Sequence, residues 1–342
     1  MKHTFVEKKP TSESCWRAAV LMGRNVATYK FALAKSLIEL ANRKENFIRM
    51  EELAEPFSRN LCEHLQHSDK QITSRSSGFL DACRSFNQNE ISKDELIGKT
   101  VSLGFNNVID AFHVVREKDV PVRFFEDDRS ARKGIQLTDS FFAMAEGVQF
   151  ANLSREAESR WRLVETAWKI GISPHLIDIA YDGEKELLYV PRHILQRGGD
   201  ITSARDALNG YQKGRCFYCY RPISIQPKDD GLAHVDHVIA HYFKRHGFEN
   251  LDGIWNLVLA CQKCNNGEDG KFEKIPALKY MERLDARNNY LVQSHHPLRE
   301  TLIRQTGNND LERGKFLNRI WNKANNLFPV HWEPEEELEF TF

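Results

Sequence analysis

The sequence predicts an α+β protein that is mainly α-helical and has three successive parts. Residues 1–200 are expected to form a mostly helical domain, residues 201–284 a small module of two strands and a helix, and residues 285–342 a helical extension with an acidic tail. Three observations lead to this order. Apolar residues recur at helical spacing over much of the first part, metal-ligating residue types gather between positions 216 and 265, and helical spacing returns beyond position 280.

Length and composition limit the classes of protein to consider. With 342 residues the chain exceeds a usual single core, and its 41% hydrophobic and 28% charged residues are typical of a globular protein. The formal net charge is zero, so any contact with nucleic acid must come from local basic patches. The N-terminus lacks an apolar signal region and no run of eighteen apolar residues occurs, which predicts a cytoplasmic protein without a membrane segment.

The first expected helix spans 27–41. Its apolar residues recur three and four positions apart and form one stripe: Phe31, Ala34, Leu37, Ile38 and Ala41. Further helices are expected at 50–67, 78–86, 105–116, 137–150 and 154–170. Ser154 is a candidate N-cap for the last of these helices. No motif of known mechanism occurs in residues 1–200, so substrate binding, regulation and docking of partner proteins all stay open as roles.

A β-hairpin is expected near 176–190. Two β-prone runs flank Asp182-Gly183, and an Asp-Gly pair favours a tight hairpin turn. Pro191 and the Gly198-Gly199 pair follow, and they predict a domain boundary near 191–202.

The seven cysteines divide into two groups. Cys15, Cys62 and Cys83 occur singly, and each is expected to be a small buried apolar side chain. The other four form two CxxC pairs, at 216/219 and 261/264. Paired spacing in a long chain without a secretory signal is typical of a zinc site rather than of disulfides, so Cys216, Cys219, Cys261 and Cys264 are predicted to bind structural Zn²⁺.

Two short runs between the CxxC pairs are expected to form strands. In His234-Val235-Asp236-His237, alternate side chains point to opposite faces, so a regular strand separates Asp236 from His237. The run 256–261 is short and apolar and leads into a helix or turn at 264–267. An aspartate, a histidine and an amide offer oxygen ligands for a hard cation and a base, a combination that indicates a nuclease.

These motifs resemble the HNH endonucleases of the His-Me finger, or ββα-metal, superfamily, in the variant whose last histidine is replaced by asparagine. The order CxxC, HVDH, IWNLVLAC and CxxCN is especially similar to phage endonuclease VII-type modules. The resemblance covers about residues 210–284 and implies a treble-clef-like zinc module. It implies that His237 is the general base, that Asp236 and Asn265 bind one catalytic Mg²⁺ (or Mn²⁺), and that Asn256 braces the loop.

Three more residues are candidates for a supporting role at the phosphate: His234, His241 and Lys271. The family commonly has a lysine three or four residues after the CN pair, whereas here two acidic residues precede Lys271. Over 201–284 twelve Lys or Arg stand against ten Asp or Glu, so the module is barely basic. Weak, salt-sensitive DNA affinity is expected unless the helical domain contributes.

Beyond residue 279 helical spacing returns, through 280–284, 288–305 and 310–327. The chain then turns acidic at 334–339. Such a tail is usually solvated, and the sharper hypothesis is that it competes with phosphate for a basic surface.

Two functional hypotheses follow. The first is an HNH endonuclease that hydrolyses DNA, with RNA the less favoured substrate, cutting one strand per active site. Its long helical region is similar in architecture to bacterial antiphage defence or restriction effectors, which would add partner proteins of a defence system. The alternative is a non-catalytic or autoinhibited zinc module that binds DNA or protein and is activated by a partner.

Overall fold

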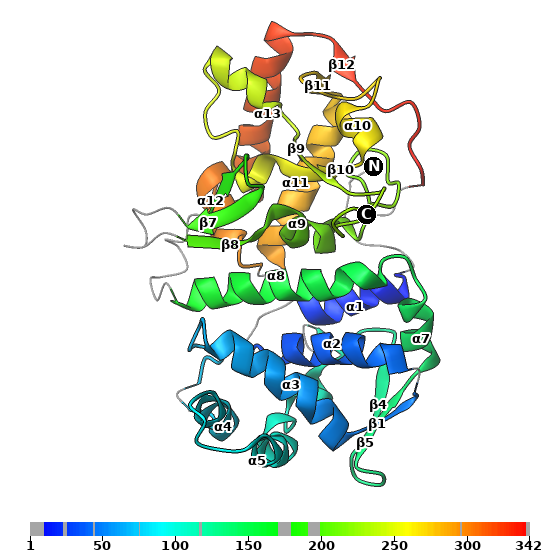
Figure 1. The fold of residues 1–342 in the computed structure, drawn as a ribbon. Coiled ribbons are helices and arrows are strands. Elements are labelled where there is room, and N and C mark those ends of the chain that lie inside the picture. The colour runs from blue at the N-terminus through cyan, green and yellow to red at the C-terminus, as the bar shows by residue number, and fades with distance from the viewer. Residues whose placement is uncertain are drawn as a thin grey trace. The chain divides into compact units, whose positions relative to one another are not determined.

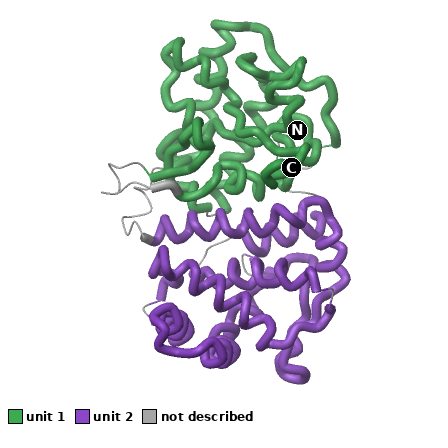
Figure 2. The backbone as a smooth tube through the Cα atoms, in the orientation of Figure 1, with its two compact units in different colours: residues 1–9, 170–342 green, residues 10–169 purple. Residues whose placement is uncertain are grey.

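The computed structural model describes residues 10–22, 26–43, 45–74, 76–115, 118–169, 179–190, 199–294 and 296–339. Two compact units divide after residue 169 (Figure 2). The chain is predominantly helical with several small sheets (Figure 1), so the predicted fold class is confirmed. Within the described parts of the chain, no helix has the length and apolar character needed to cross a membrane.

Helices dominate the N-terminal unit. Their bounds are α1 Ser12–Leu21, α2 Tyr29–Leu40, α3 Met50–Leu65, α4 Gly78–Asn87, α5 Lys93–Lys99, α6 Val108–Ala111, α7 Asp139–Ala145 and α8 Phe150–Lys169. Several begin where a hydroxyl side chain accepts a hydrogen bond from the backbone of the first turn, with Thr11, Ser77, Ser92 and Thr138 as the caps. A π-helical turn, Thr100–Gly104, follows α5.

Two expectations for this unit are wrong in detail. The predicted helix at 105–116 is reduced to α6, because Val114–Val115 forms strand β2, which pairs with β3 (Lys118–Asp119). Ser154 does not cap a helix, since α8 already begins at Phe150. The structure also contains an antiparallel sheet that the sequence did not predict, in the order β1 (Phe47–Arg49), β5 (Gly134–Leu137), β4 (Phe125–Asp128).

The C-terminal unit begins, in the described residues, with an antiparallel sheet. Strand β7 (Leu187–Val190) pairs with β6 (Ala180–Asp182) on one side and with β8 (Gly199–Ser203) on the other. Residues 176–178 of the expected hairpin lie outside the described residues. The sequence placed a boundary near 191–202, whereas the units divide after residue 169. The reason is that β8 joins β7 and leads directly into α9 (Ala204–Gln212), which ties this sheet to the module that follows.

The centre of the unit is a two-stranded sheet followed by a helix. Strand β9 (His234–His237) pairs antiparallel with β10 (Leu257–Ala260), and α10 (Gln262–Asn266) comes next. The register sets Leu257 opposite His237 and Val258 opposite Asp236. Every residue of β10 is buried, so this strand fixes β9 from the inner side. Two 3₁₀ turns lie between the strands, at His241–His246 and Ile254–Asn256.

Long helices complete the unit: α11 Leu278–Gln293, α12 Arg299–Thr306 and α13 Asp310–Leu327. Helix α11 crosses residue 284, so a domain boundary drawn there would cut a continuous helix. Two of its arginines are buried and donate to backbone carbonyls of the module. Arg283 binds the carbonyls of Phe217 and Tyr218, and Arg287 binds those of Ile254 and Trp255. The chain then forms β12 (His331–Trp332), which pairs in parallel with β11 (Ile275–Pro276).

Candidate metal centre and active site

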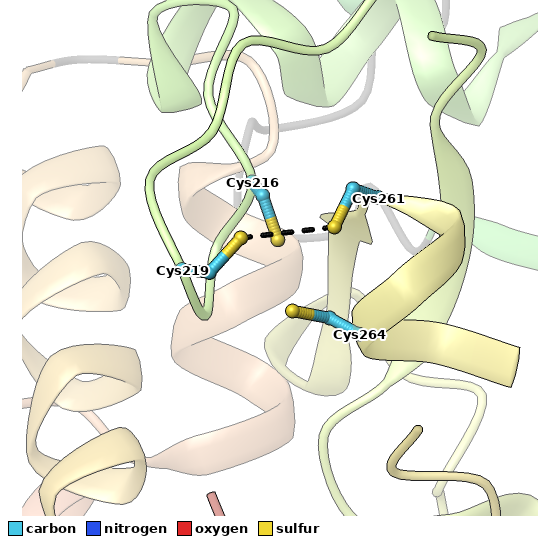
Figure 3. A group of neighbouring side chains, drawn as sticks. All are labelled: Cys216, Cys219, Cys261 and Cys264. Atoms are coloured by element: carbon cyan, nitrogen blue, oxygen red, sulfur yellow. Dashed lines mark hydrogen bonds between the residues drawn. The ribbon is translucent and has the colours of Figure 1, made fainter. Parts of the chain in front are cut away.

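The four paired cysteines meet in one cluster. Their sulfur atoms all lie within 4.8 Å of one another, and the Sγ atoms of Cys219 and Cys261 are 3.7 Å apart (Figure 3). Four sulfurs at about 2.3 Å from a tetrahedral zinc ion stand about 3.8 Å from each other. Cys216, Cys219 and Cys264 are buried and Cys261 is half-buried. The predicted thiolate group therefore has the spacing and the seclusion of a structural zinc site.

The backbone places the first cysteine pair against the sheet. The Phe217 N–H donates to the carbonyl of Leu259 in β10, and the Gln212 side chain at the end of α9 makes two hydrogen bonds to the same Leu259 backbone. The second pair follows β10 directly, because Cys261 is the N-cap residue of α10 and Cys264 lies within that helix. Strand β10 thus connects the two halves of the sulfur cluster.

Asp236 is linked to the first cysteine pair through Tyr218, which lies between Cys216 and Cys219. The Tyr218 hydroxyl donates to Asp236 Oδ2 at 2.6 Å, and burial raises the pKa of this tyrosine well above its ordinary value. The other carboxylate oxygen, Oδ1, lies 3.3 Å from Lys271 Nζ. Lys271 is fully buried and also donates to the carbonyl of His237. One side chain, Tyr218, therefore connects the sulfur cluster to Asp236.

His237 pairs with an acidic residue that the sequence analysis missed. Its Nε2 atom lies 3.1 Å from Asp252 Oδ1. The hydrogen bond from His237 and the ion pair with Lys244 hold the pKa of Asp252 well below its usual range. When a neutral His237 ring donates Nε2–H to this carboxylate, Nδ1 is left as the proton acceptor. No spacing motif marks Asp252, since it lies in the irregular segment between the strands.

The loop between the strands is braced by Asn256. Its side-chain Nδ2 donates to the carbonyls of Ile239 and Leu251, and its Oδ1 accepts from the Ile239 N–H. The residue is fully buried. These three bonds hold Ile239, at the start of the segment between the strands, and Leu251, the residue directly before Asp252. Asn256 thus contacts backbone on both sides of the loop.

A cavity of about 350 Å³ opens beside β9. It is lined by Asp236, His237, Ala240, His241, Tyr242, Lys244, Arg245, Phe272 and Glu273. Lys244 and Arg245 are basic, His237 and His241 can become so, and Asp236 and Glu273 are acidic. Asp236 and His237 thus line the same cavity although they are neighbours on a strand, and a phosphate there would meet the charges of Lys244 and Arg245.

Residues 216–271 match the family model described as HNH endonuclease. The chain contains an HNH endonuclease domain. The matched segment runs from Cys216 to Lys271 and includes β9, β10 and α10. Comparison of the chain with curated proteins and with solved structures finds no match. The HNH domain implies a nucleic-acid substrate, and the family uses divalent metal ions.

Other candidate residues take different places in the HNH domain. Asn265 lies in α10 directly after Cys264, and its carbonyl accepts from the Phe272 N–H, but it is not among the residues that line the cavity. His234, on β9, lies opposite Ala260 of β10 and is half-buried. His241 is exposed, with its ring 5.8 Å from that of His237. Lys271 is buried, and its ammonium pairs with Asp236 and donates hydrogen bonds to the carbonyls of His237 and Phe272.

Proposed function

We propose that this protein is a metal-dependent DNA endonuclease that cuts one strand per active site. The observation that carries the proposal is the placement of Asp236 and His237, each held by its own partner, at one cavity that Lys244 and Arg245 also line. A carboxylate and an imidazole on adjacent residues can approach a phosphodiester from two directions. This is the arrangement that hydrolysis with one metal ion and one general base requires.

The donor set fits a hard divalent cation. Asp236 offers a carboxylate oxygen and Asn265 an amide oxygen, and a cation at Asp236 Oδ1 would replace the 3.3 Å contact of that atom with the Lys271 ammonium. Asp236 and Asn265 would hold Mg²⁺ or Mn²⁺, which accepts few protein ligands and keeps several waters. The cation would neutralise the scissile phosphate and the departing oxygen. The four thiols suit Zn²⁺ instead, because soft sulfur ligands favour it over Mg²⁺.

Side chains of the protein would activate the attacking water and bind the substrate. Asp252 holds the His237 ring by its Nε2–H, and Nδ1 takes a proton from the attacking water. Asn256 keeps the loop of Asp252 in place through its three backbone bonds. Lys244 and Arg245 line the cavity and would attract the phosphate backbone.

DNA is the proposed substrate, with RNA less favoured. The combination of an HNH domain with a long helical region supports a role in bacterial antiphage defence or restriction, in the cytoplasm and with partner proteins. This part of the proposal rests on architecture alone.

The experiment is a nicking assay on supercoiled plasmid with Mg²⁺ or Mn²⁺. The parent protein should convert the plasmid to open circles, and His237→Ala should lose this activity while its zinc content stays unchanged. The matched control is His331→Ala, a histidine outside the HNH match. Equal rates for His237→Ala and the parent would contradict the assignment of the base. Labelled RNA in parallel reactions tests the less favoured substrate.

A second candidate is an HNH module that binds without cutting or is inhibited until a partner releases it. Two observations favour it. Tyr218 and Lys271 already engage both oxygens of Asp236. Four glutamates of the tail each pair with a basic residue of the module or of α11: Glu333 with Lys279, Glu335 with Lys263, Glu336 with Arg221, and Glu337 with Arg283.

The tail pairs can be removed without shortening the chain. In the double variant Glu335→Gln/Glu336→Gln, Lys263 and Arg221 lose their partners while the Glu337 pair remains. If the tail inhibits, DNA binding and nicking should both increase, and the salt dependence should steepen by about 0.9 for each new phosphate contact. The double variant Glu249→Gln/Glu282→Gln is the charge-matched control. An unchanged rate and salt slope would remove the inhibitory role.

A further inference from the structure

The N-terminal unit contains a cavity that is separate from the HNH domain. Its volume is about 750 Å³, within the range of pockets that hold small organic ligands. The lining comes from three stretches of chain, within 22–30, 72–79 and 103–115. It mixes hydroxyl and amide side chains with apolar ones, and among the described lining residues none is acidic.

Among the described lining residues, Lys30 is the one charged side chain. Lys30, in α2, donates a hydrogen bond from Nζ to the carbonyl of Val114 at 3.1 Å. Among the described residues no carboxylate lies within ion-pair distance of it. An ammonium that meets only a backbone carbonyl in a partly enclosed space is a strong site for an anion, because its charge is poorly screened there.

Other residues of the lining are apolar. Leu103, Val26 and Val114 are large aliphatic residues that stay exposed, and all three line the cavity. Large aliphatic side chains that are exposed together on a concave surface mark a place where an apolar group of another molecule binds. The cavity therefore offers a charged contact and an apolar wall at once.

The backbone at this wall is unusual. Leu103 lies in the π-helical turn Thr100–Gly104, and Asn106 and Asn107, which directly follow that turn, also line the cavity. Single π-helical turns are rare and occur frequently at functional sites. At Gly104 an added Cβ would lie 3.2 Å from the Phe57 ring, so the turn is packed closely against the core. The wall is therefore held in place by the core.

We infer that this cavity binds a small organic anion with a ring-bearing or otherwise apolar body, whose anionic group pairs with Lys30 and whose body packs on Leu103, Val26 and Val114. The N-terminal unit is thereby a ligand-binding unit, independent of the chemistry proposed for the HNH domain. Burial lowers the pKa of Lys30 to about 8, which leaves most of the amine protonated at neutral pH and poorly hydrated. A bound anion would compensate for that lost hydration.

The test separates the charge from the ring. The full-length protein is titrated by calorimetry with 1-naphthyl phosphate, with 1-naphthol as the ring without the anion, and with inorganic phosphate as the anion without the ring. The expected result is one site per chain that binds 1-naphthyl phosphate at least tenfold more tightly than either fragment. Absence of binding at millimolar 1-naphthyl phosphate would overturn the inference.

Variants locate the site. Lys30→Met should weaken 1-naphthyl phosphate at least tenfold, whereas Lys70→Met, which removes the same charge from an exposed position outside the lining, should leave binding unchanged. If Lys30→Met fails to fold, Ala111→Phe serves instead, because Ala111 is an exposed lining residue whose enlargement reduces the cavity. Equal binding by the parent and by the folded Lys30→Met or Ala111→Phe variant would place the ligand elsewhere and overturn the inference.

Discussion

The two units of this protein are held together by different kinds of interaction. The N-terminal unit packs a continuous aromatic core, in which Phe57 lies 4.7 Å from Phe105 and 5.5 Å from Phe79 between ring centroids. The HNH domain depends on polar anchors: four thiols in one cluster, and the buried Arg283 and Arg287 bound to backbone carbonyls. Apolar burial stabilises the aromatic core of the first unit, whereas we expect the HNH domain to gain stability from a zinc ion bound by its four thiols.

This difference has a consequence for function. Tyr218 lies within the first cysteine pair and binds Asp236, and Asn265 follows the last cysteine. The residues proposed for catalysis are therefore positioned by the proposed zinc site. A mutation in the aromatic core should alter stability, and a mutation in the sulfur cluster should alter both stability and chemistry.

The largest expected effect is loss of a zinc ligand. Cys264→Ser should release the zinc and abolish nicking, because structural zinc contributes about 10–16 kcal/mol in small zinc-dependent folds. Hydrogen exchange should rise across β9, β10 and α10 and stay unchanged in α2 and α3. Cys83→Ser, the same chemical change at a buried cysteine of the N-terminal unit, should keep its zinc. Protection of β9 in a zinc-free Cys264→Ser protein would contradict the comparison.

A change in the aromatic core should have the opposite distribution. Phe57 is fully buried, so Phe57→Ala should lower the free energy of unfolding of the N-terminal unit by about 3–5 kcal/mol. Zinc content and the nicking rate should stay at the parent level below the unfolding temperature. Hydrogen exchange in each unit during thermal unfolding measures the stability of that unit, and the plasmid assay measures the nicking rate. Loss of nicking while the N-terminal unit is still folded would show that the units are coupled.

Asp252→Asn tests the histidine partner found in the structure. The amide keeps a hydrogen-bond acceptor for His237 Nε2–H but loses the charge, so the nicking rate should fall about tenfold to a hundredfold, equivalent to about 1.4–2.7 kcal/mol. Zinc content should not change. Glu249→Gln neutralises an exposed acid of the same domain and should have no effect. If the two variants nick equally fast, Asp252 does not position the base.

The smallest effect concerns pH and the N-terminal unit. The His64 ring lies between Glu165, at 2.8 Å, and Glu158, at 3.1 Å. Burial alone would lower the pKa of His64, but these two hydrogen bonds outweigh burial and raise the pKa above 6.5. The stabilisation is therefore complete below pH 6.5 and is lost as the pH rises through the folded-state pKa.

The change in the free energy of unfolding per pH unit has an upper limit. One proton bound more tightly in the folded state changes the free energy of unfolding by at most about 1.4 kcal/mol per pH unit. The N-terminal unit of the parent should thus lose stability as the pH rises from 6.5 through the raised pKa of His64, and His64→Gln should flatten this slope. Chemical denaturation at several pH values, read by exchange in α3, gives both slopes. Equal slopes would show that His64 titrates alike in the folded and unfolded states.

The sequence predicted some elements better than others, for physical reasons. Helices α2 and α3 were placed well because their apolar stripes are long. The β1-β5-β4 sheet was missed, since its strands have three or four residues and β1 pairs with a strand more than eighty positions away. The helix expected at 105–116 was wrong in its second half, because Val114 and Val115 form strand β2 and pair with β3.

The site divides in the same way. The cysteine cluster could be predicted because ligand chemistry fixes residue type and spacing together, while the roles of Asp236 and His237 stay a proposal. Asp252 and Tyr218 carry no spacing signal, since one lies in an irregular loop and the other reads as an ordinary residue between two cysteines. Lys271 was considered for the phosphate, and only the fold reveals that its ammonium faces Asp236 from a buried position.

The central claim is that the sulfur cluster positions the catalytic residues, and metal reconstitution tests it most directly. Protein is freed of all metal, then assayed for plasmid nicking with Mg²⁺ alone, with one equivalent of Zn²⁺ alone, and with both. The account predicts nicking only when both ions are present, with the rate reaching its maximum at one Zn²⁺ per chain. Nicking at the full rate with Mg²⁺ alone, in protein shown to contain no zinc, would contradict it.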